Sequence, residues 1–161
     1  MSLDLPTLLR AYAVGLFPMS DGRDDPTVFW VEPDRRAVLP MDGFRLSQSL
    51  RKTLRSERFA VTVDRDFDGI IRLCAQSAAD RPETWINHPI ERSFIALHEM
   101  GLAHSVECWG ANDQGEPVLL GGLYGLALGR AFFGESMVSR ARDASKVALA
   151  ALVARLRVGG F

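Results

Sequence analysis

Apolar residues in the first third of the chain occur in short runs separated by turn residues. Four of them fall near one face of residues 3–14, which predicts a short helix ended by Gly15. Pro18 then favours an extended path, and the apolar runs 29–31 and 37–39 predict two short strands. This segment is too small to enclose a core of its own, so we expect it to pack on the rest of the chain.

The middle of the chain alternates helix and strand signals. Ser47 is a predicted N-cap for a helix over residues 48–58. The alternation of apolar and polar residues over 59–63 predicts a strand. Either Asp64 or Asp66 is expected to cap the helix that follows.

The second half of the chain predicts one more helix, a run of strands and a final helix. Pro89 begins a helix that Gly101 ends, and alternation over 104–109 predicts a strand. Two longer apolar runs joined at residues 128–130 predict a β-hairpin. Asp143 is the expected N-cap of a strongly apolar last helix, stopped by a glycine pair. This order predicts an α+β fold with a mainly antiparallel sheet flanked by helices.

The composition predicts a globular cytoplasmic protein. Of its 161 residues, 47% are hydrophobic and 24% charged, the balance of a protein with a substantial core. The two cysteines, Cys74 and Cys108, lack metal-ligand spacing and fit a reducing compartment. No secretory leader opens the chain and no apolar run reaches the roughly 18 residues of a membrane span. We therefore expect no membrane partner.

The net charge of −1 gives no global attraction to nucleic acid, so any such surface must be local. Residues 45–58 hold one acidic and five basic residues, a local charge of +4. On the residues alone, a solvated helix face is the simpler interpretation, and a phosphate-contacting stripe is the alternative. The basic residues are Arg45, Arg51, Lys52, Arg55 and Arg58.

Glu135 is the clearest candidate for a functional residue. It lies between Gly134 and Ser136 in an apolar strand, where an unpaired carboxylate would be costly to bury. Trp85 precedes a helix that starts with proline, and its indole is either a lid on the core or a stacking platform. Motifs for metal, for a serine nucleophile and for nucleotide cofactors are absent, so we expect no metal and no cofactor.

Seven blocks of sequence carry a resemblance to one family. In collinear order between Tyr12 and Phe161, the chain closely resembles the leucyl/phenylalanyl-tRNA–protein transferases. The blocks are YAVGLFPM (12–19), FWVEPDRRAVLP (29–40), SQSLRK (47–52), TWINHPI (84–90), LHEMGLAHSVECW (97–109), GGLYGLALGRAFFGESMVSR (121–140) and DASKVALAALV (143–153).

The resemblance implies an aminoacyltransferase. Such an enzyme moves Leu or Phe, and Met less well, from aminoacyl-tRNA to proteins with N-terminal Arg or Lys, which marks them for N-degron proteolysis. It also implies a small N-terminal domain, here 1–41, and an N-acetyltransferase-like (GNAT-like) domain, here 42–161, that works without acetyl-CoA. We expect a monomer.

The resemblance further implies roles for individual residues. Trp85 occupies the family's adenosine-contacting position, and Met19 stands where many members have a second stacking Trp. Glu135 is expected to receive the basic N-terminus of the acceptor, and the basic stripe Arg51, Lys52, Arg55 and Arg58 is expected to contact tRNA phosphates. The donor side chain is expected to contact Leu123, Phe132, Met137, Ser139 and Leu152.

The end of the chain departs from the family pattern. Members continue past the position of Phe161 into a strand with an Asp and a Gln that are assigned to the incoming amine. Without that strand, we expect the GNAT-like domain to be incomplete and this chain to be inactive or barely active. Two alternatives stay open: a CoA-dependent N-acyltransferase of the same fold, and a non-catalytic remnant that binds aminoacyl-tRNA.

Overall fold

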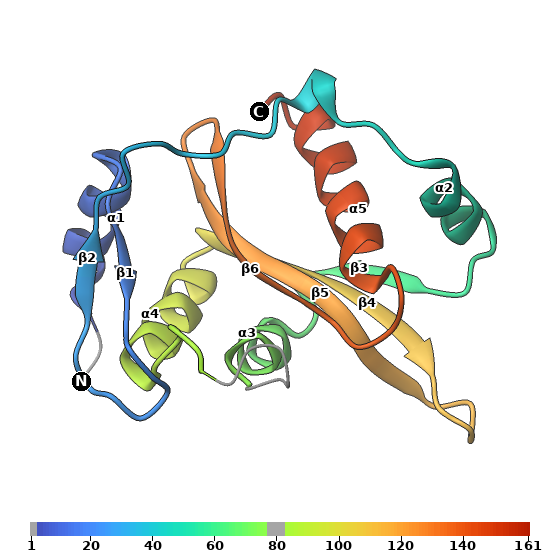
Figure 1. The fold of residues 1–161 in the computed structure, drawn as a ribbon, viewed down its shortest axis with the longest axis horizontal. Coiled ribbons are helices and arrows are strands. Elements are labelled where there is room, and N and C mark those ends of the chain that lie inside the picture. Colours follow the sequence, from blue (N-terminus) through green and yellow to red (C-terminus); the bar gives the residue numbers. More distant parts are fainter. Residues whose placement is uncertain (1–2, 77–82) are drawn as a thin grey trace.

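The computed structural model describes residues 3–76 and 83–161, which form five α-helices, one short 3-10 turn and six strands (Figure 1). None of the described helices is long and apolar enough to cross a membrane. The elements are α1 (Leu5–Ala13), β1 (Phe17–Met19), β2 (Phe29–Val31), the turn Met41–Gly43, α2 (Gln48–Arg55), β3 (Ala60–Val63), α3 (Phe67–Ala75), α4 (His88–Glu99), β4 (Ala103–Ala111), β5 (Pro117–Leu128), β6 (Ala131–Ser139) and α5 (Ala144–Val158).

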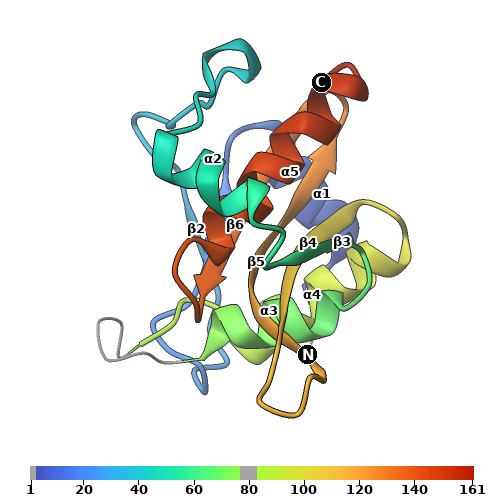
Figure 2. The same cartoon turned by 90° about the vertical axis from the view of Figure 1, so that its right-hand side faces the viewer.

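The larger sheet has the order β3-β4-β5-β6, and every neighbouring pair is antiparallel. Helix α5 lies across one face, and α3 and α4 cover the other (Figures 1 and 2). Two successive glycines of β5 mark these faces: a Cβ at Gly121 would meet Ala144 of α5, and one at Gly122 would meet Ile70 of α3. The predicted α+β class and antiparallel sheet are confirmed.

The N-terminal segment packs on the rest of the chain, as expected. Helix α1 and the two-stranded ribbon β1–β2 stand beside α4 (Figure 1). Leu8 and Tyr12 of α1 are buried in the main core, together with residues of α3, α4 and β5. The side-chain amide of Asn87 donates to the carbonyl oxygens of Asp25 and Thr27, at 2.8 and 3.1 Å, and so ties the loop between β1 and β2 to the start of α4.

Several predicted helix ends are confirmed by their hydrogen bonds. The Ser47 hydroxyl accepts from the Leu50 amide at 3.2 Å and caps α2. Asp66, rather than Asp64, caps α3 through the Gly69 amide at 2.9 Å. Gly101 follows α4 with a φ of 73°, the left-handed conformation that ends many helices.

Three expectations are wrong in detail. Residues 37–39 form no strand; Val38 is 80% exposed and no described strand pairs with it. Helix α2 ends at Arg55 instead of 58, because Glu57 is left-handed. Asp143 stands at the N-cap position of α5, but its carboxylate gives no capping bond. It accepts instead from the Thr53 hydroxyl at 3.0 Å.

Candidate functional site

Glu135 is the extra residue of a β-bulge in the hairpin β5–β6. Tyr124 pairs with Ser136 and Gly125 pairs with Gly134, so Glu135 has no cross-strand partner. One unpaired residue reverses the alternation of side chains beyond it. The bulge therefore decides which face of the sheet this carboxylate occupies.

The bulge turns Glu135 toward the face covered by α3 and α4. Leu123 and its partner Met137 lie on the α5 face, and Tyr124 and its partner Ser136 lie on the opposite one. Gly134 pairs with Gly125, which again belongs to the α5 face. Glu135 follows Gly134, so its side chain shares the face of Ser136 and Tyr124.

On that face Glu135 meets groups from the N-terminal segment. The Tyr12 ring of α1 packs edge-on against Phe133 of β6 at 5.3 Å, and the Arg36 guanidinium lies 5.7 Å from the centre of the same ring, two residues before Glu135. Burial raises the pKa of Glu135 to about 7, against the opposing effects of Tyr12 first and Arg36 second. This carboxyl group therefore titrates near neutral pH, in the range where proton exchange with a substrate amine is easiest.

The residues expected around the donor side chain are only partly brought together. Leu123, Phe132 and Leu152 join one apolar cluster between the sheet and α5. Met137 shares their face but is 46% exposed. Glu135 lies on the opposite face of the sheet from this cluster, so the backbone of the sheet separates the carboxylate from the apolar side chains.

The glycines of β5 serve close packing within the protein. A Cβ at Gly121 would stand 2.7 Å from the Val138 carbonyl oxygen, and one at Gly122 would stand 2.4 Å from that of Val106. Both neighbours are backbone atoms that cannot give way. At these two positions, therefore, the absence of a side chain allows the close approach of neighbouring strands.

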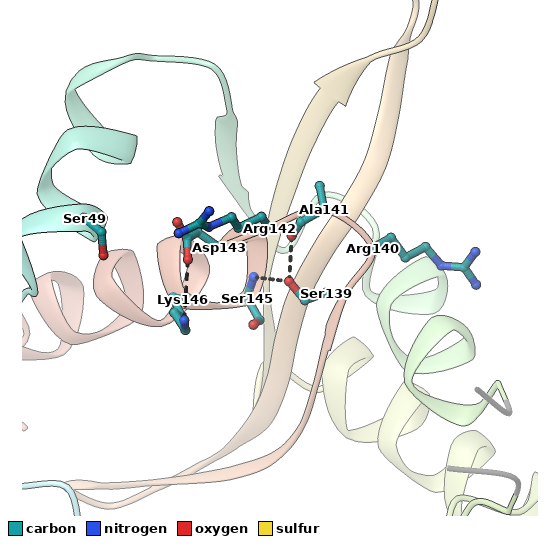
Figure 3. Close-up of a pocket in the computed structure, with 8 residues that line it drawn as sticks. All are labelled: Ser49, Ser139, Arg140, Ala141, Arg142, Asp143, Ser145 and Lys146. Atoms are coloured by element: carbon teal, nitrogen blue, oxygen red, sulfur yellow. Dashed lines mark hydrogen bonds and ion pairs between the residues drawn. The ribbon is translucent and has the colours of Figure 1, made fainter. Parts of the chain in front are cut away.

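Ser139 lies in a different place from the apolar cluster. It lines a polar cavity of about 500 Å³ between the end of β6 and the start of α5 (Figure 3). Its hydroxyl accepts from the Ser145 amide at 3.2 Å and donates to the Ala141 carbonyl at 2.9 Å. Arg142 and Lys146 border the cavity, whereas the Arg140 side chain points away toward α3 (Figure 3).

Trp85 and Met19 both lie where the N-terminal segment meets α4. Trp85 is half-buried against the main core, two residues before Asn87, which holds the β1–β2 loop. Met19 pairs with Phe29, whose ring is 39% exposed. This pairing was not predicted, although the extended path at Pro18 and the apolar run 29–31 each indicated extended chain.

Tyr12 and Arg36 were also missed as neighbours of Glu135. Tyr12 was predicted only as an apolar position of the first helix, and its ring is indeed buried. The pairing of residues 12 and 36 with residue 135 spans about 100 positions of sequence. No local pattern of residue types reports such a contact.

The basic stripe is partly present. Arg51, Lys52 and Arg55 are exposed on α2. Arg58 lies beyond the end of the helix, so it does not share the predicted face. Its guanidinium donates to the Arg142 carbonyl and stacks over the Phe59 ring at 4.4 Å.

Two of the histidines make packing and hydrogen-bonding contacts. The His98 ring stacks on Phe67 with 4.4 Å between ring centres, and its Nδ1 lies 2.9 Å from the Ala103 carbonyl. Nδ1 of His104 lies 2.8 Å from the Asp64 carboxylate.

Comparison with protein families matches nearly the whole chain to one family. A family model described as leucyl/phenylalanyl-tRNA protein transferase matches residues 38–161. The model of the N-terminal domain of the same transferase matches residues 1–34.

Curated bacterial relatives agree with the family models. A leucyl/phenylalanyl-tRNA–protein transferase of Zymomonas mobilis is 58% identical over 159 residues, which covers 99% of this chain and 58% of the relative. One of Paramagnetospirillum magneticum is 59% identical over 96% of this chain and 71% of its own length. One of Rhizorhabdus wittichii is 58% identical over 99% of this chain and 62% of its own length. The chain thus spans about six to seven tenths of these relatives.

Proposed function

The chain belongs to the leucyl/phenylalanyl-tRNA protein transferase family, and on that premise we propose that it serves aminoacyl transfer from charged tRNA to a protein N-terminus. The donor is Leu or Phe, and Met less well, and the acceptor begins with Arg or Lys. The product carries a new N-terminal residue that marks it for N-degron proteolysis. Because charged tRNA is a cytoplasmic substrate, we place this activity in the cytoplasm, with the protein acting as a monomer.

One observation carries this proposal: at the β5–β6 hairpin an apolar cluster lies on one face of the sheet and a half-buried carboxylate lies on the other. Leu123, Phe132 and Leu152 offer the apolar surroundings that a Leu or Phe side chain requires. Glu135 offers the charge that a basic acceptor terminus requires. A donor and an acceptor that meet over this strand would bring an ester and an amine together.

The remaining expected residues fit a path for the tRNA. Trp85 is half-buried against the main core, and we assign its indole to stacking on the terminal adenosine. The exposed cations of α2 supply charge for backbone phosphates. Met137 pairs with Leu123 of the donor cluster and is 46% exposed, whereas Ser139 lies farther along β6, at the polar cavity before α5.

The architecture suits a GNAT-like domain preceded by a small N-terminal domain. A run of antiparallel strands with α5 across one face and α3 and α4 on the other supports the GNAT-like assignment. The family models, which divide the chain after residue 34 and before residue 38, support a boundary near Met41.

The chemistry needs positioning more than activation. The α-amine nitrogen attacks the carbonyl carbon of the aminoacyl ester, an amide bond forms, and the ester C–O bond breaks. The tRNA hydroxyl leaves with a proton, and the amine loses one. The ester is already activated, so alignment and stabilisation of the oxyanion supply most of the rate.

Glu135→Ala tests the acceptor role. We expect this variant to bind an Arg-starting peptide at least about tenfold more weakly, because a charge-assisted contact is lost. Binding of Leu-charged tRNA should be unchanged. Peptide affinity is measured by fluorescence anisotropy with saturating amide-linked leucyl-tRNA, and Ser136→Ala on the same face is the control. Unchanged peptide affinity in Glu135→Ala would assign Glu135 a structural role only.

The CoA-dependent alternative rests on the polar cavity before α5. Arg142 and Lys146 suit an anion, but the Ser145 amide is already occupied by the Ser139 hydroxyl. A pyrophosphate therefore finds few free N–H groups at this helix start. Isothermal titration with acetyl-CoA should show no binding; binding in the micromolar range would favour the acyltransferase. If charged tRNA binds and no transfer occurs, the non-catalytic alternative gains support.

A further inference from the structure

Two buried tyrosine hydroxyls lack hydrogen-bond partners in the described part of the chain. The Tyr12 side chain is 1% exposed and that of Tyr124 is fully buried. Neither phenolic oxygen has a partner within hydrogen-bond geometry. Unsatisfied buried hydroxyls are rare in folded proteins, and each requires an explanation.

Aromatic contacts hold both rings in place. Tyr12 meets Phe133 edge-on, with 5.3 Å between ring centres, and Phe94 at 6.3 Å. Tyr124 meets Phe94 at 5.4 Å and Phe67 at 5.7 Å. Rings packed on two sides cannot move toward other partners, so the core sets the position of each phenolic oxygen.

The groups that face Glu135 come from three separate elements. Tyr12 arrives from α1, Arg36 from the segment after β2, and Tyr124 from β5. Arg36 is anchored independently of Glu135: its guanidinium stacks over Phe17 at 4.9 Å and donates to the Gly15 carbonyl at 2.8 Å. The N-terminal segment thus presents one hydroxyl donor and one cation to the bulge of β6.

We propose that Tyr12 is a positioning residue for Glu135, whose hydroxyl donates to the carboxylate while Arg36 stabilises its charge. The inference rests on the proposed function in that Glu135 receives the cationic acceptor. The Tyr12 ring packs on Phe133, two residues before Glu135, and its hydroxyl has no hydrogen-bond partner, so it is the donor available when Glu135 ionises. The N-terminal segment therefore controls the orientation and charge of the acceptor carboxylate.

The two tyrosines differ in their influence on Glu135, and that difference makes the idea testable. The Tyr12 hydroxyl, as a hydrogen-bond donor to an ionised Glu135, lowers the pKa of this carboxyl group, and Arg36 lowers it through its charge. Glu135 raises the pKa of the Tyr124 phenol by charge alone. Loss of the Tyr12 hydroxyl should therefore raise the pKa of Glu135, and loss of the Tyr124 hydroxyl should leave that pKa unchanged.

The experiment follows the Glu135 carboxyl carbon by NMR in the whole chain as pH is varied. Tyr12→Phe keeps the ring and its contacts, and should raise the titration midpoint by roughly one pH unit, the value of one hydrogen bond to a charged group. Tyr124→Phe, the matched control, should leave the midpoint near 7. An unchanged midpoint in Tyr12→Phe, or equal shifts in both variants, overturns the proposal.

A second variant and a second readout complete the test. Arg36 is exposed, so Arg36→Gln leaves the core intact and should also raise the midpoint, even if Tyr12→Phe fails to fold; an unchanged midpoint there contradicts the role of Arg36. Binding of an Arg-starting peptide should weaken as pH falls, and Tyr12→Phe should move that decline to higher pH. If the NMR midpoints shift as expected and the peptide does not bind, the proposed function fails and the positioning role stands.

Discussion

Burying the Glu135 carboxyl group costs the folded chain free energy whenever that group is ionised. Its pKa is raised from 4.5 to about 7, chiefly by burial. Between these two values the folded chain binds more protons than the unfolded chain, so the free energy of unfolding falls as pH rises. The contribution is fully present below about pH 4.5 and is lost as pH rises through about 7.

Glu135→Gln should remove this dependence. The variant should be more stable than the parent at pH 8 and similar at pH 4.5, with a difference of at most about 3 kcal/mol at the higher pH. Urea unfolding at both pH values measures it. The exposed Glu32→Gln is the control, and a gain for Glu135→Gln that is equal at both pH values would contradict the shift.

Trp85→Ala should weaken binding of the charged tRNA end. If its indole stacks on the terminal adenosine, the loss should be roughly 1–3 kcal/mol, or about 5- to 150-fold in Kd. Amide-linked leucyl-adenosine is the probe, measured by calorimetry. Trp109→Ala removes an indole whose Nε1 is occupied by the Thr62 hydroxyl, and it should leave this affinity unchanged. Equal losses in both variants would point to general destabilisation.

At the scale of single residues, local chemistry was predictable and orientation was not. Glu135 stood out because a carboxylate in an apolar strand is costly. Its face could not be inferred, because alternation from Gly134 to Met137 gives the wrong answer once a bulge intervenes. Only the pairing with Tyr124 reveals the extra residue.

Among the elements, α2 carries the prediction for tRNA. If Arg51 and Arg55 contact phosphates, replacing both with Gln should lower affinity and reduce the slope of log K against log salt by roughly 1–2. Filter binding of tRNA between about 50 and 200 mM salt measures the slope. Arg10→Gln on α1 is the control. An unchanged slope in the α2 variant would show that Arg51 and Arg55 are solvated and contact no phosphate.

Helix ends were the most predictable part of the fold, because they depend on neighbours in sequence. Ser47 and Asp66 cap their helices through amides three residues ahead. Asp143 failed the same rule for a reason outside its own segment. Thr53 of α2 competes for its carboxylate, and no local pattern includes that partner.

In the molecule as a whole, one carboxylate joins the N-terminal segment to the helical layer. Glu91 of α4 is 90% buried at its side chain and accepts from Arg23 of the β1–β2 loop and from Arg72 of α3. Glu91→Gln should lower the free energy of unfolding by about 1–3 kcal/mol, because Arg23 and Arg72 each lose one charged partner at a buried position.

Urea unfolding of the intact chain measures this effect, with Asp68→Asn as control. Asp68 pairs with Arg72 at 3.1 Å within α3, but its side chain is 45% exposed. Its loss should cost at most about 0.5 kcal/mol. Equal costs for the two variants would show that the Glu91 tie adds nothing beyond a surface pair.

The sequence predicted the layers of this molecule better than its contacts. An antiparallel sheet with helices on both faces followed from the order of the elements. The meeting of Tyr12, Arg36 and Glu135 did not, because it depends on how the N-terminal segment docks. That docking rests on ties such as Asn87 to the β1–β2 loop, between residues with no shared local pattern.

The unpaired residue at position 135 places a parity rule on strand β6. Deleting one residue between Gly134 and Ser136, or adding one, exchanges the two faces for everything on one side of the change. If β6 had no bulge and kept the register of Leu123 with Met137, a carboxylate two residues before Met137 would lie on the α5 face. The number of residues in this strand therefore determines whether its acidic group faces Tyr12 and Tyr124 or the apolar cluster beneath α5.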